Sequence, residues 1–169
     1  TNNSDHKGYH LIFNQNGTVT VYKVQYETRL TVTALNPSSG TNDYTLINNE
    51  NLFGTYTIPV NCAVIYVQDH VWIEGTVSGK VTVVAADVDN VGVVPYVVLR
   101  NNILYSTYDG SAGLTVISEG NVLIAANATS SLTLNGTFIA QGGAFGRNLY
   151  ACPSAYEPKG TLTSSGSPV

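Results

Sequence analysis

The feature that most constrains the fold is a short apolar run that recurs along the chain at a nearly fixed interval. Five four-residue runs each begin with Val or Leu, and successive starts lie 17, 16, 17 and 18 residues apart. In most runs the first and third residues are aliphatic and the second is often Thr, which is the alternation of a half-buried β-strand. A sixth run begins at Leu162. The five starts are Val64, Val81, Val97, Leu114 and Leu132.

Most intervals between these runs carry a second short apolar strand, such as Val71–Ile73 or Val122–Ile124, and Gly, Asn, Asp or Ser mark the corners. A unit of this size cannot bury its own apolar face, but stacked units form a continuous core. The interval therefore predicts an all-β fold, a parallel β-helix (β-solenoid) with rungs of about 17 residues over residues 62–169. An antiparallel β-sandwich is the competing fold, because its strands also follow one another at short intervals.

The first 61 residues show a different pattern. Alternation in Tyr9–Phe13 and Thr18–Val24 surrounds the turn sequence Asn14–Gly17, which predicts an antiparallel hairpin, and Leu30–Leu35 predicts a further strand. We expect residues 1–61 to form a small antiparallel β cap over one end of the solenoid, where an open edge invites aggregation. The other end stops just after the sixth run, so we expect the solenoid to be truncated there.

Charged residues are scarce. Asp, Glu, Lys and Arg make up 11% of the chain, and 7 basic and 11 acidic residues give a net charge of −4, whereas soluble domains carry roughly 25% of such residues. The basic residues are scattered singly, which argues against binding to nucleic acid or anionic lipid. No apolar run approaches the roughly 20 residues of a membrane span. This composition is typical of an extracellular or cell-surface protein.

Four sequence motifs lie within residues 64–146. They are Ile65-Tyr66-Val67, Gly75-Thr76-Val77-Ser78-Gly79-Lys80-Val81-Thr82, Asn102-Ile103-Leu104-Tyr105 and Ile139-Ala140-Gln141-Gly142-Gly143. With these motifs the chain resembles bacterial pilus-assembly proteins of the PilX-like, minor-pilin class. The resemblance implies a prepilin-type membrane leader followed by a secreted β-helical domain, and attachment to a pilus. It brings no catalytic residues with it.

Two residue pairs are candidates for a metal site and for a disulfide. Asp87 and Asp89 place carboxylates at alternate positions beside Asn90, an oxygen cluster that a hard cation such as calcium favours, although a solvated turn explains the same pattern. Cys62 and Cys152 have no C-x-x-C partner, so they form either a disulfide or two free buried thiols. We therefore expect no cofactor, with calcium as the one candidate that the sequence leaves open.

Acidic residues and one histidine offer the material for catalysis. Asp69, His70 and Glu74 combine a base with carboxylates, but no nucleophile lies in a recognisable motif. Asp109 and Glu119, with Asp87 and Asp89, are candidates for a carboxylate pair that cleaves polysaccharide. We expect these side chains to be polar corners, and we predict that the protein is not an enzyme.

Threonines and tyrosines suggest binding. Thr82, Thr115 and Thr133 are expected to form an outward row, as in ice-binding solenoids, although threonine is common on any exposed strand. Aromatic side chains on a rigid scaffold can stack on sugars or anchor a protein partner. The tyrosines at or near loops are Tyr96, Tyr105, Tyr108, Tyr150 and Tyr156.

Together these features predict a secreted, non-catalytic structural or adhesive module, associated with a pilus or a cell surface. The expected partners are a protein or glycan surface, pilus subunits or further copies of the chain. Two alternatives remain open, namely a carbohydrate-active β-helical enzyme and a ligand-binding or ice-binding scaffold.

Overall fold

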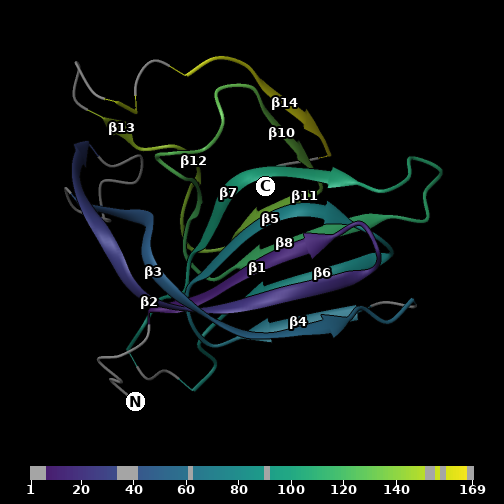
Figure 1. Cartoon of the computed structure of the whole chain (residues 1–169). Coiled ribbons are helices and arrows are strands. Elements are labelled where there is room, and N and C mark those ends of the chain that lie inside the picture. The colour runs from purple at the N-terminus through teal and green to yellow at the C-terminus, as the bar shows by residue number, and fades with distance from the viewer. Residues whose placement is uncertain are drawn as a thin grey trace.

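A computed structural model describes residues 7–33, 42–60, 63–89, 92–150, 155–156 and 159–166. Throughout these ranges the regular structure consists of β-strands, arranged in one ten-stranded and one four-stranded sheet (Figure 1). In the described ranges no helix is long and apolar enough to cross a membrane. The all-β class that the strand patterns predict is confirmed.

The strands differ greatly in length. The ten-stranded sheet contains β1 (Gly8–Asn14), β2 (Thr18–Thr33), β3 (Asn42–Thr57), β5 (Val71–Val77), β7 (Val97–Tyr105), β9 (Val122–Ile124), β10 (Leu132–Asn135), β12 (Phe145–Gly146), β13 (Leu149–Tyr150) and β14 (Leu162–Ser165). The four-stranded sheet contains β4 (Ala63–Val67), β6 (Lys80–Ala85), β8 (Gly113–Ser118) and β11 (Thr137–Ala140).

The ten-stranded sheet mixes antiparallel and parallel pairs. β1, β2 and β3 pair antiparallel, and the turn between β1 and β2 closes where Gly17 donates its backbone N–H to the carbonyl of Asn14 over 3.0 Å. The predicted hairpin around Asn14–Gly17 is therefore confirmed. The other edge of β1 pairs parallel with β5, and β5, β7, β9 and β12 continue in parallel order. β10 joins β7 and β14, and β13 pairs with the end of β2.

The main core lies between the inner faces of the two sheets. Alternate residues of the strands point into it, as the burial pattern of β6 and β8 shows, and the side chains of Val83 and Val116 are fully buried. Leu11 and Ile73 contribute from the ten-stranded sheet. Two facing sheets supply enough apolar surface to stabilise a chain that has few charged residues.

A second, smaller core secures the far end of the β2–β3 ribbon. Val32 and Leu46 from the ribbon pack with Ala126 and Tyr150. The indole N–H of fully buried Trp72 in β5 also donates to the carbonyl of Thr45 in β3 over 2.9 Å. The ribbon is thus fixed to the sheet at residues that lie far apart in the chain.

The predicted parallel β-helix with rungs of about 17 residues is wrong, because the recurring runs do not form one stack but divide between the two sheets. The runs at Val81 and Leu114 are neighbours in the four-stranded sheet, whereas the run at Val97 belongs to the ten-stranded sheet and pairs with Val71 and Val122. Leu132 also lies in the ten-stranded sheet, where it pairs with Leu162. The regularly spaced runs therefore belong to strands of two different sheets, and their spacing does not identify a single stack.

The predicted antiparallel cap is wrong for a related reason. β1 and β2 do not form a separate layer over an open end, since β1 continues the ten-stranded sheet through its parallel pairing with β5. The separate strand expected from Leu30 is the end of β2, which continues to Thr33, and residues 34–35 lie outside the described ranges. The boundary placed between residues 61 and 62 also lies outside them.

Candidate functional site

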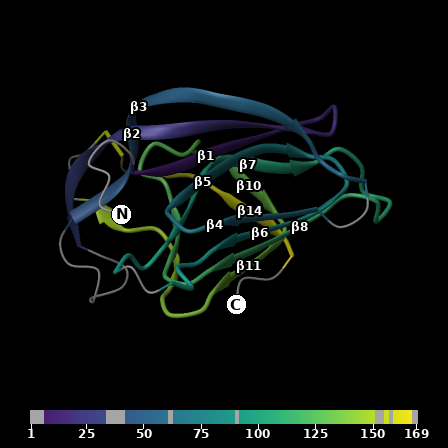
Figure 2. The same cartoon turned by 90° about the horizontal axis from the view of Figure 1, so that it is seen from below.

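The outer face of the four-stranded sheet carries two straight rows of uncharged side chains. The pairings β4–β6, β6–β8 and β8–β11 are parallel and in register, so equivalent residues stand side by side about 4.8 Å apart (Figure 2). The first row contains Val64, Thr82, Thr115 and Thr137, and the second contains Tyr66, Val84, Ile117 and Ile139. We call these eight residues the outer face.

The alternation of each strand directs the outer face away from the core. In β6 and β8 every second residue is buried, and the residues between them, such as Thr82 and Thr115, are partly exposed. Parallel sheets are usually covered on both faces. An uncovered parallel face formed of Thr, Val, Ile and Tyr is a surface suited to contact with another molecule.

The threonine row differs from the predicted one in one member. Thr82 and Thr115 are direct neighbours as expected, but Thr133 lies in the other sheet, where it pairs with Thr163. Thr137 takes its place beside Thr115. The sequence pattern missed Thr137 because it follows Gly136, whose φ of 150° starts a new strand directly after β10.

One edge of the outer face is more exposed than its centre. β4 is the last strand of the four-stranded sheet, and Val64 and Tyr66 are 67% and 46% exposed. The hydroxyl of Tyr66 donates a hydrogen bond to the carbonyl of Ala86 over 2.9 Å, which fixes the position of the ring. The face therefore ends in an aromatic side chain with a fixed orientation.

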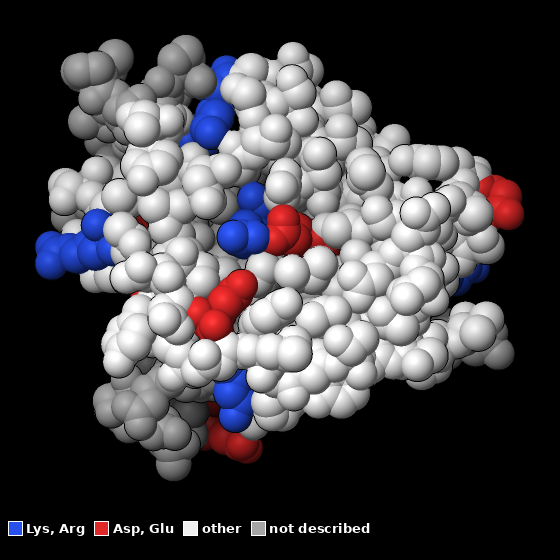
Figure 3. Space-filling model, viewed as in Figure 1, with Lys and Arg blue, Asp and Glu red and all other residues white. Residues whose placement is uncertain are grey.

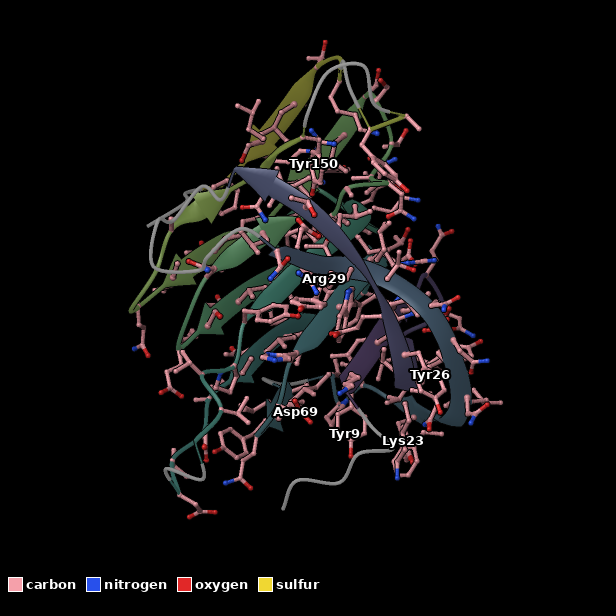
Figure 4. All side chains as sticks on the ribbon, turned by 90° about the vertical axis from the view of Figure 1, so that its left-hand side faces the viewer. Tyr9, Lys23, Tyr26, Arg29, Asp69 and Tyr150 are labelled. Atoms are coloured by element: carbon pink, nitrogen blue, oxygen red, sulfur yellow. The ribbon has the colours of Figure 1, made fainter. Side chains whose placement is uncertain are left out.

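A second group of exposed aromatic residues lies on the β1–β2–β3 strands. Phe53 is 52% exposed, its ring lies edge-on to Tyr9 with centroids 6.1 Å apart, and the amine of Lys23 lies 4.8 Å from its centroid. Figure 4 shows the labelled side chains of Tyr9, Lys23 and Tyr26 near one another, with Lys23 and Tyr26 in the middle part of β2. Tyr26 is 59% exposed. Phe53, Lys23 and Tyr26 lie within strands, so the expectation of exposed tyrosines near loops did not include this group.

A charged network links β3 to β1, β5 and β7. The two ring nitrogens of buried His10 contact Glu50 of β3 at 2.8 Å and Glu74 of β5 at 3.0 Å, and Arg100 of β7 also contacts Glu74. Burial alone would raise the pKa of Glu74, but the hydrogen bond from His10 and the charge of Arg100 lower it below its ordinary value. In Figure 3 the face seen in Figure 1 is mostly uncharged, with acidic and basic groups in contact near its centre.

Glu74, which the sequence analysis weighed as a catalytic candidate and interpreted as a polar corner, belongs to this network. Glu74 does not act with His70, since it contacts His10 and Arg100. His70 accepts a hydrogen bond from the backbone N–H of Tyr96 and stacks on the Tyr96 ring. Glu74 therefore does not join Asp69 and His70 in one group.

The other candidate acids also have structural contacts. Asp109 stands in an exposed loop, where hydrogen bonds from Ser111 lower its pKa to about 2. Glu119 accepts a hydrogen bond from the backbone N–H of Asp87 over 2.7 Å. Asp109 therefore stabilises its own loop, whereas Glu119 joins the segment after β8 to the segment after β6.

The calcium candidate consists of one buried and one exposed carboxylate. Asp87 is buried, and neither of its carboxylate oxygens has a partner among the described residues, while exposed Asp89 accepts a hydrogen bond from Gln68 over 2.7 Å. Over the described part of the chain, no group of three or more acidic, His or Cys side chains is placed to hold a metal ion. Calcium at Asp87 and Asp89 stays a prediction.

The cysteines and the tyrosines near loops are the remaining candidates from the sequence, and the structure describes only the tyrosines among them. Cys62 and Cys152 lie outside the described ranges, so their pairing stays a prediction. Of the tyrosines near loops, Tyr150 is buried and Tyr108 is strongly exposed.

Comparison with known proteins identifies no relative. No family model, no curated protein and no solved structure matches the chain. The resemblance to pilus-assembly proteins therefore stays a prediction, and the argument about function rests on the geometry of this chain.

Proposed function

We propose that the protein is a non-catalytic adhesive module of the cell surface or extracellular space, and that its outer face makes the adhesive contact. The observation that carries this proposal is the register of the four-stranded sheet, which brings eight uncharged side chains into two straight rows. Such a surface loses little solvation energy when it is covered, because it buries no charge.

The tight packing behind the outer face supports a binding role that depends on a rigid surface. Val83 and Val116 pack into the core directly behind the rows, and both are fully buried. A flat face that does not rearrange loses little conformational entropy when a partner binds. The partner surface is expected to be flat and uncharged, in the form of a neutral glycan or another protein, including a pilus subunit or a second copy of this chain.

The contacts of the acidic residues support the non-catalytic part of the proposal. Glu74 is paired with His10 and Arg100, and Asp109 is held by Ser111. These contacts give Glu74 and Asp109 structural roles that require no reaction.

A charge placed at the centre of the outer face tests the proposal. Thr115→Lys puts an amine between Thr82 and Thr137, and Thr57→Lys makes the same change at an exposed position of β3 as a control. Binding is measured on an array of neutral glycans, and self-association by sedimentation. We expect the wild type and Thr57→Lys to bind alike and Thr115→Lys to bind about tenfold more weakly, since covering an unpaired charge is costly.

Two outcomes would count against adhesion through the outer face. One is that the wild type neither binds a glycan nor associates with itself. The other is that Thr115→Lys and Thr57→Lys bind equally well, which would move the contact to another surface, such as the aromatic group around Phe53.

The aligned threonines also favour a second candidate function, which is binding to ice. Thr82, Thr115 and Thr137 present hydroxyl and methyl groups at the regular spacing of neighbouring strands. The measurement is the growth of ice crystals at low protein concentration, with Thr115→Lys and Thr57→Lys again compared. Inhibition by the wild type that Thr115→Lys abolishes, without glycan binding or self-association, would replace adhesion by ice binding.

A further inference from the structure

A cavity of about 400 Å³ lies where parallel strands of the ten-stranded sheet begin. His70, Tyr96 and Asn121 directly precede β5, β7 and β9, and the backbone joins them in order, since Val71 donates to the carbonyl of Tyr96 and Val97 to that of Asn121. The first residues of β3 form the opposite wall. The volume falls within the range of about 300 to 1,000 Å³ that is usual for small-molecule sites.

His70 offers a hydrogen-bond donor to this cavity. Its Nδ1 accepts from the backbone N–H of Tyr96 over 3.2 Å, and its ring stacks on the Tyr96 ring with centroids 3.7 Å apart. Burial lowers the pKa of His70 to about 4, so the ring is neutral near pH 7 and carries its proton on Nε2. Among the described residues no acceptor contacts this Nε2–H group.

The start of β3 offers two further polar groups. The side-chain oxygen of Asn42 accepts from Nε of Arg29 over 2.8 Å, which leaves its amide N–H groups without an acceptor among the described residues. The hydroxyl of Tyr44, a residue 39% exposed, likewise has no partner within the described ranges. Asn42 and Tyr44 both line the cavity.

Among the described residues of the cavity wall, the one acidic side chain already has its hydrogen-bond partners. The carboxylate of buried Asp43 accepts hydrogen bonds from the backbone N–H and the hydroxyl of Thr45, from the side-chain amide of Asn148 and from the hydroxyl of Tyr150. Among the described residues that line the cavity, none is Lys or Arg. An anionic ligand would therefore lack a counter-charge, and a cationic ligand would meet a carboxylate whose hydrogen bonds are already formed.

The wall also has an apolar side. Leu123 and Val94 line the cavity together with the ring of Tyr96. Apolar carbon and aromatic surface next to a few polar groups is the combination that binds the C–H and O–H faces of a sugar.

We propose that this cavity is a binding site for a neutral polyhydroxylated molecule of monosaccharide size, with His70, Asn42 and Tyr44 as its hydrogen-bonding residues. Ring and hydroxyl oxygens of the ligand accept from the imidazole and amide N–H groups, and the tyrosine hydroxyl donates to or accepts from a ligand hydroxyl. The site shares no residue with the outer face, so the proposal stands independently of adhesion through that face.

The test is a titration of the ¹⁵N-labelled chain with three neutral hexoses and with two charged derivatives of glucose. The probes are glucose, galactose and mannose, together with glucuronate and glucosamine as the charged counterparts of glucose. We expect at least one neutral hexose to shift the backbone amide signals of His70, Asn42 and Asn121 in a saturable manner. Where glucose binds, its two charged counterparts are expected to bind about fivefold more weakly or not at all.

Two conservative variants test the assigned residues. Tyr44→Phe removes one hydroxyl and keeps the ring, and Asn42→Asp replaces the amide N–H groups and keeps the acceptor for Arg29. Each is expected to weaken hexose binding by about five- to tenfold, which is the effect of one hydrogen bond. Tyr26→Phe is the matched control, because it removes an exposed tyrosine hydroxyl outside the cavity and should bind as the wild type does.

The proposal is overturned if no neutral hexose gives saturable shifts at the cavity up to about 50 mM. It is also overturned if glucuronate or glucosamine binds more tightly than glucose. Equal binding by the wild type, Tyr44→Phe and Asn42→Asp, each with an otherwise unchanged spectrum, would remove the assigned residues from the site.

Discussion

The hydroxyl of Tyr96 donates a hydrogen bond to a carboxylate oxygen of Glu27 over 3.2 Å, although 69 positions separate the two residues in the chain. Glu27 lies within β2, and Tyr96 directly precedes β7. The bond therefore joins the long ribbon to the parallel part of the ten-stranded sheet, beside the cavity that Tyr96 lines.

Glu27 is expected to destabilise the protein above neutral pH. Burial raises its pKa to about 7, so folding favours the protonated form, and the stability that this provides is present below about pH 4.5 and is lost as the pH rises through 7. Glu27→Gln keeps a hydrogen-bonding group and removes the charge. We expect it to increase the free energy of unfolding by about 1 to 2 kcal/mol at pH 8, after allowance for partial exposure, and to have little effect at pH 4.5.

Chemical denaturation of both proteins at several pH values checks this expectation. A gain that is equal at pH 4.5 and pH 8 would show that the charge of Glu27 is not its source.

His70 is expected to destabilise the protein at acidic pH, which is opposite to the effect of Glu27. Burial lowers its pKa to about 4, so folding favours the neutral ring, and the resulting stability is present above about pH 6.5 and is lost as the pH falls toward 4. Between about pH 4.5 and 6.5 the contributions of His70 and Glu27 oppose each other. In the Glu27→Gln variant, the free energy of unfolding should therefore fall more steeply on acidification than in the wild type.

The ring signals of His70 provide a direct measurement. An NMR titration should show the midpoint of His70 near pH 4, and a midpoint near 6.5 would contradict a buried neutral ring and its assigned Nε2 proton.

Two glycines with positive φ angles should respond differently to substitution. A Cβ on Gly75 would lie 2.2 Å from the carbonyl oxygen of Phe13, whereas one on Gly79 would have no neighbour within 4 Å. Their φ angles are 110° and 84°, so both alanines have a strained backbone, but only Gly75→Ala also forces β1 and β5 apart. We expect Gly79→Ala to cost about 1 kcal/mol and Gly75→Ala at least about 2 kcal/mol more.

Thermal and denaturant unfolding of the two variants gives the comparison, with Gly79→Ala as the control for strain alone. Equal losses of stability would mean that the close approach of β1 to β5 does not constrain position 75.

Parts of this fold can be predicted from sequence because their signals are local. The period of two in the runs at Val81 and Leu114, and the turn sequence Asn14–Gly17, identify strands and a hairpin that the structure contains. The partners of each strand are not a local property. Val97 pairs with Val71 and Val122 rather than with Val81, and equal spacing cannot distinguish two facing sheets.

Neither the strand β3 nor the cavity could be predicted from the sequence, and the reasons differ. Much of β3 is exposed on both faces, so Asn42–Thr57 shows no alternation of apolar and polar residues. The cavity combines Asn42, His70 and Asn121, which are brought together only by long-range pairing. The outer face was partly predicted, since Thr82 and Thr115 are neighbours while Thr137 had to be found from the register.

The attachment of β3 to the sheet should depend strongly on Trp72. Its fully buried indole donates to the carbonyl of Thr45, and the hydroxyl of Thr45 in turn accepts from the backbone N–H of Ala126. Trp72→Phe leaves a small cavity and a buried carbonyl without a donor, so we expect the free energy of unfolding to fall by about 2 to 4 kcal/mol. Because Trp72 is the only tryptophan of the chain, unfolding is followed by circular dichroism.

Hydrogen exchange separates a local effect of Trp72→Phe from a global one. If Trp72 fixes the start of β3, the amides of Thr45 and Leu46 should lose more protection than those of Val83 and Val116, which lie in the four-stranded sheet. The main core behind the outer face is then preserved while the wall of the cavity loosens. A loss of protection that is uniform over both sheets, or a change in stability below about 1 kcal/mol, would show that the indole does not hold the ribbon in place.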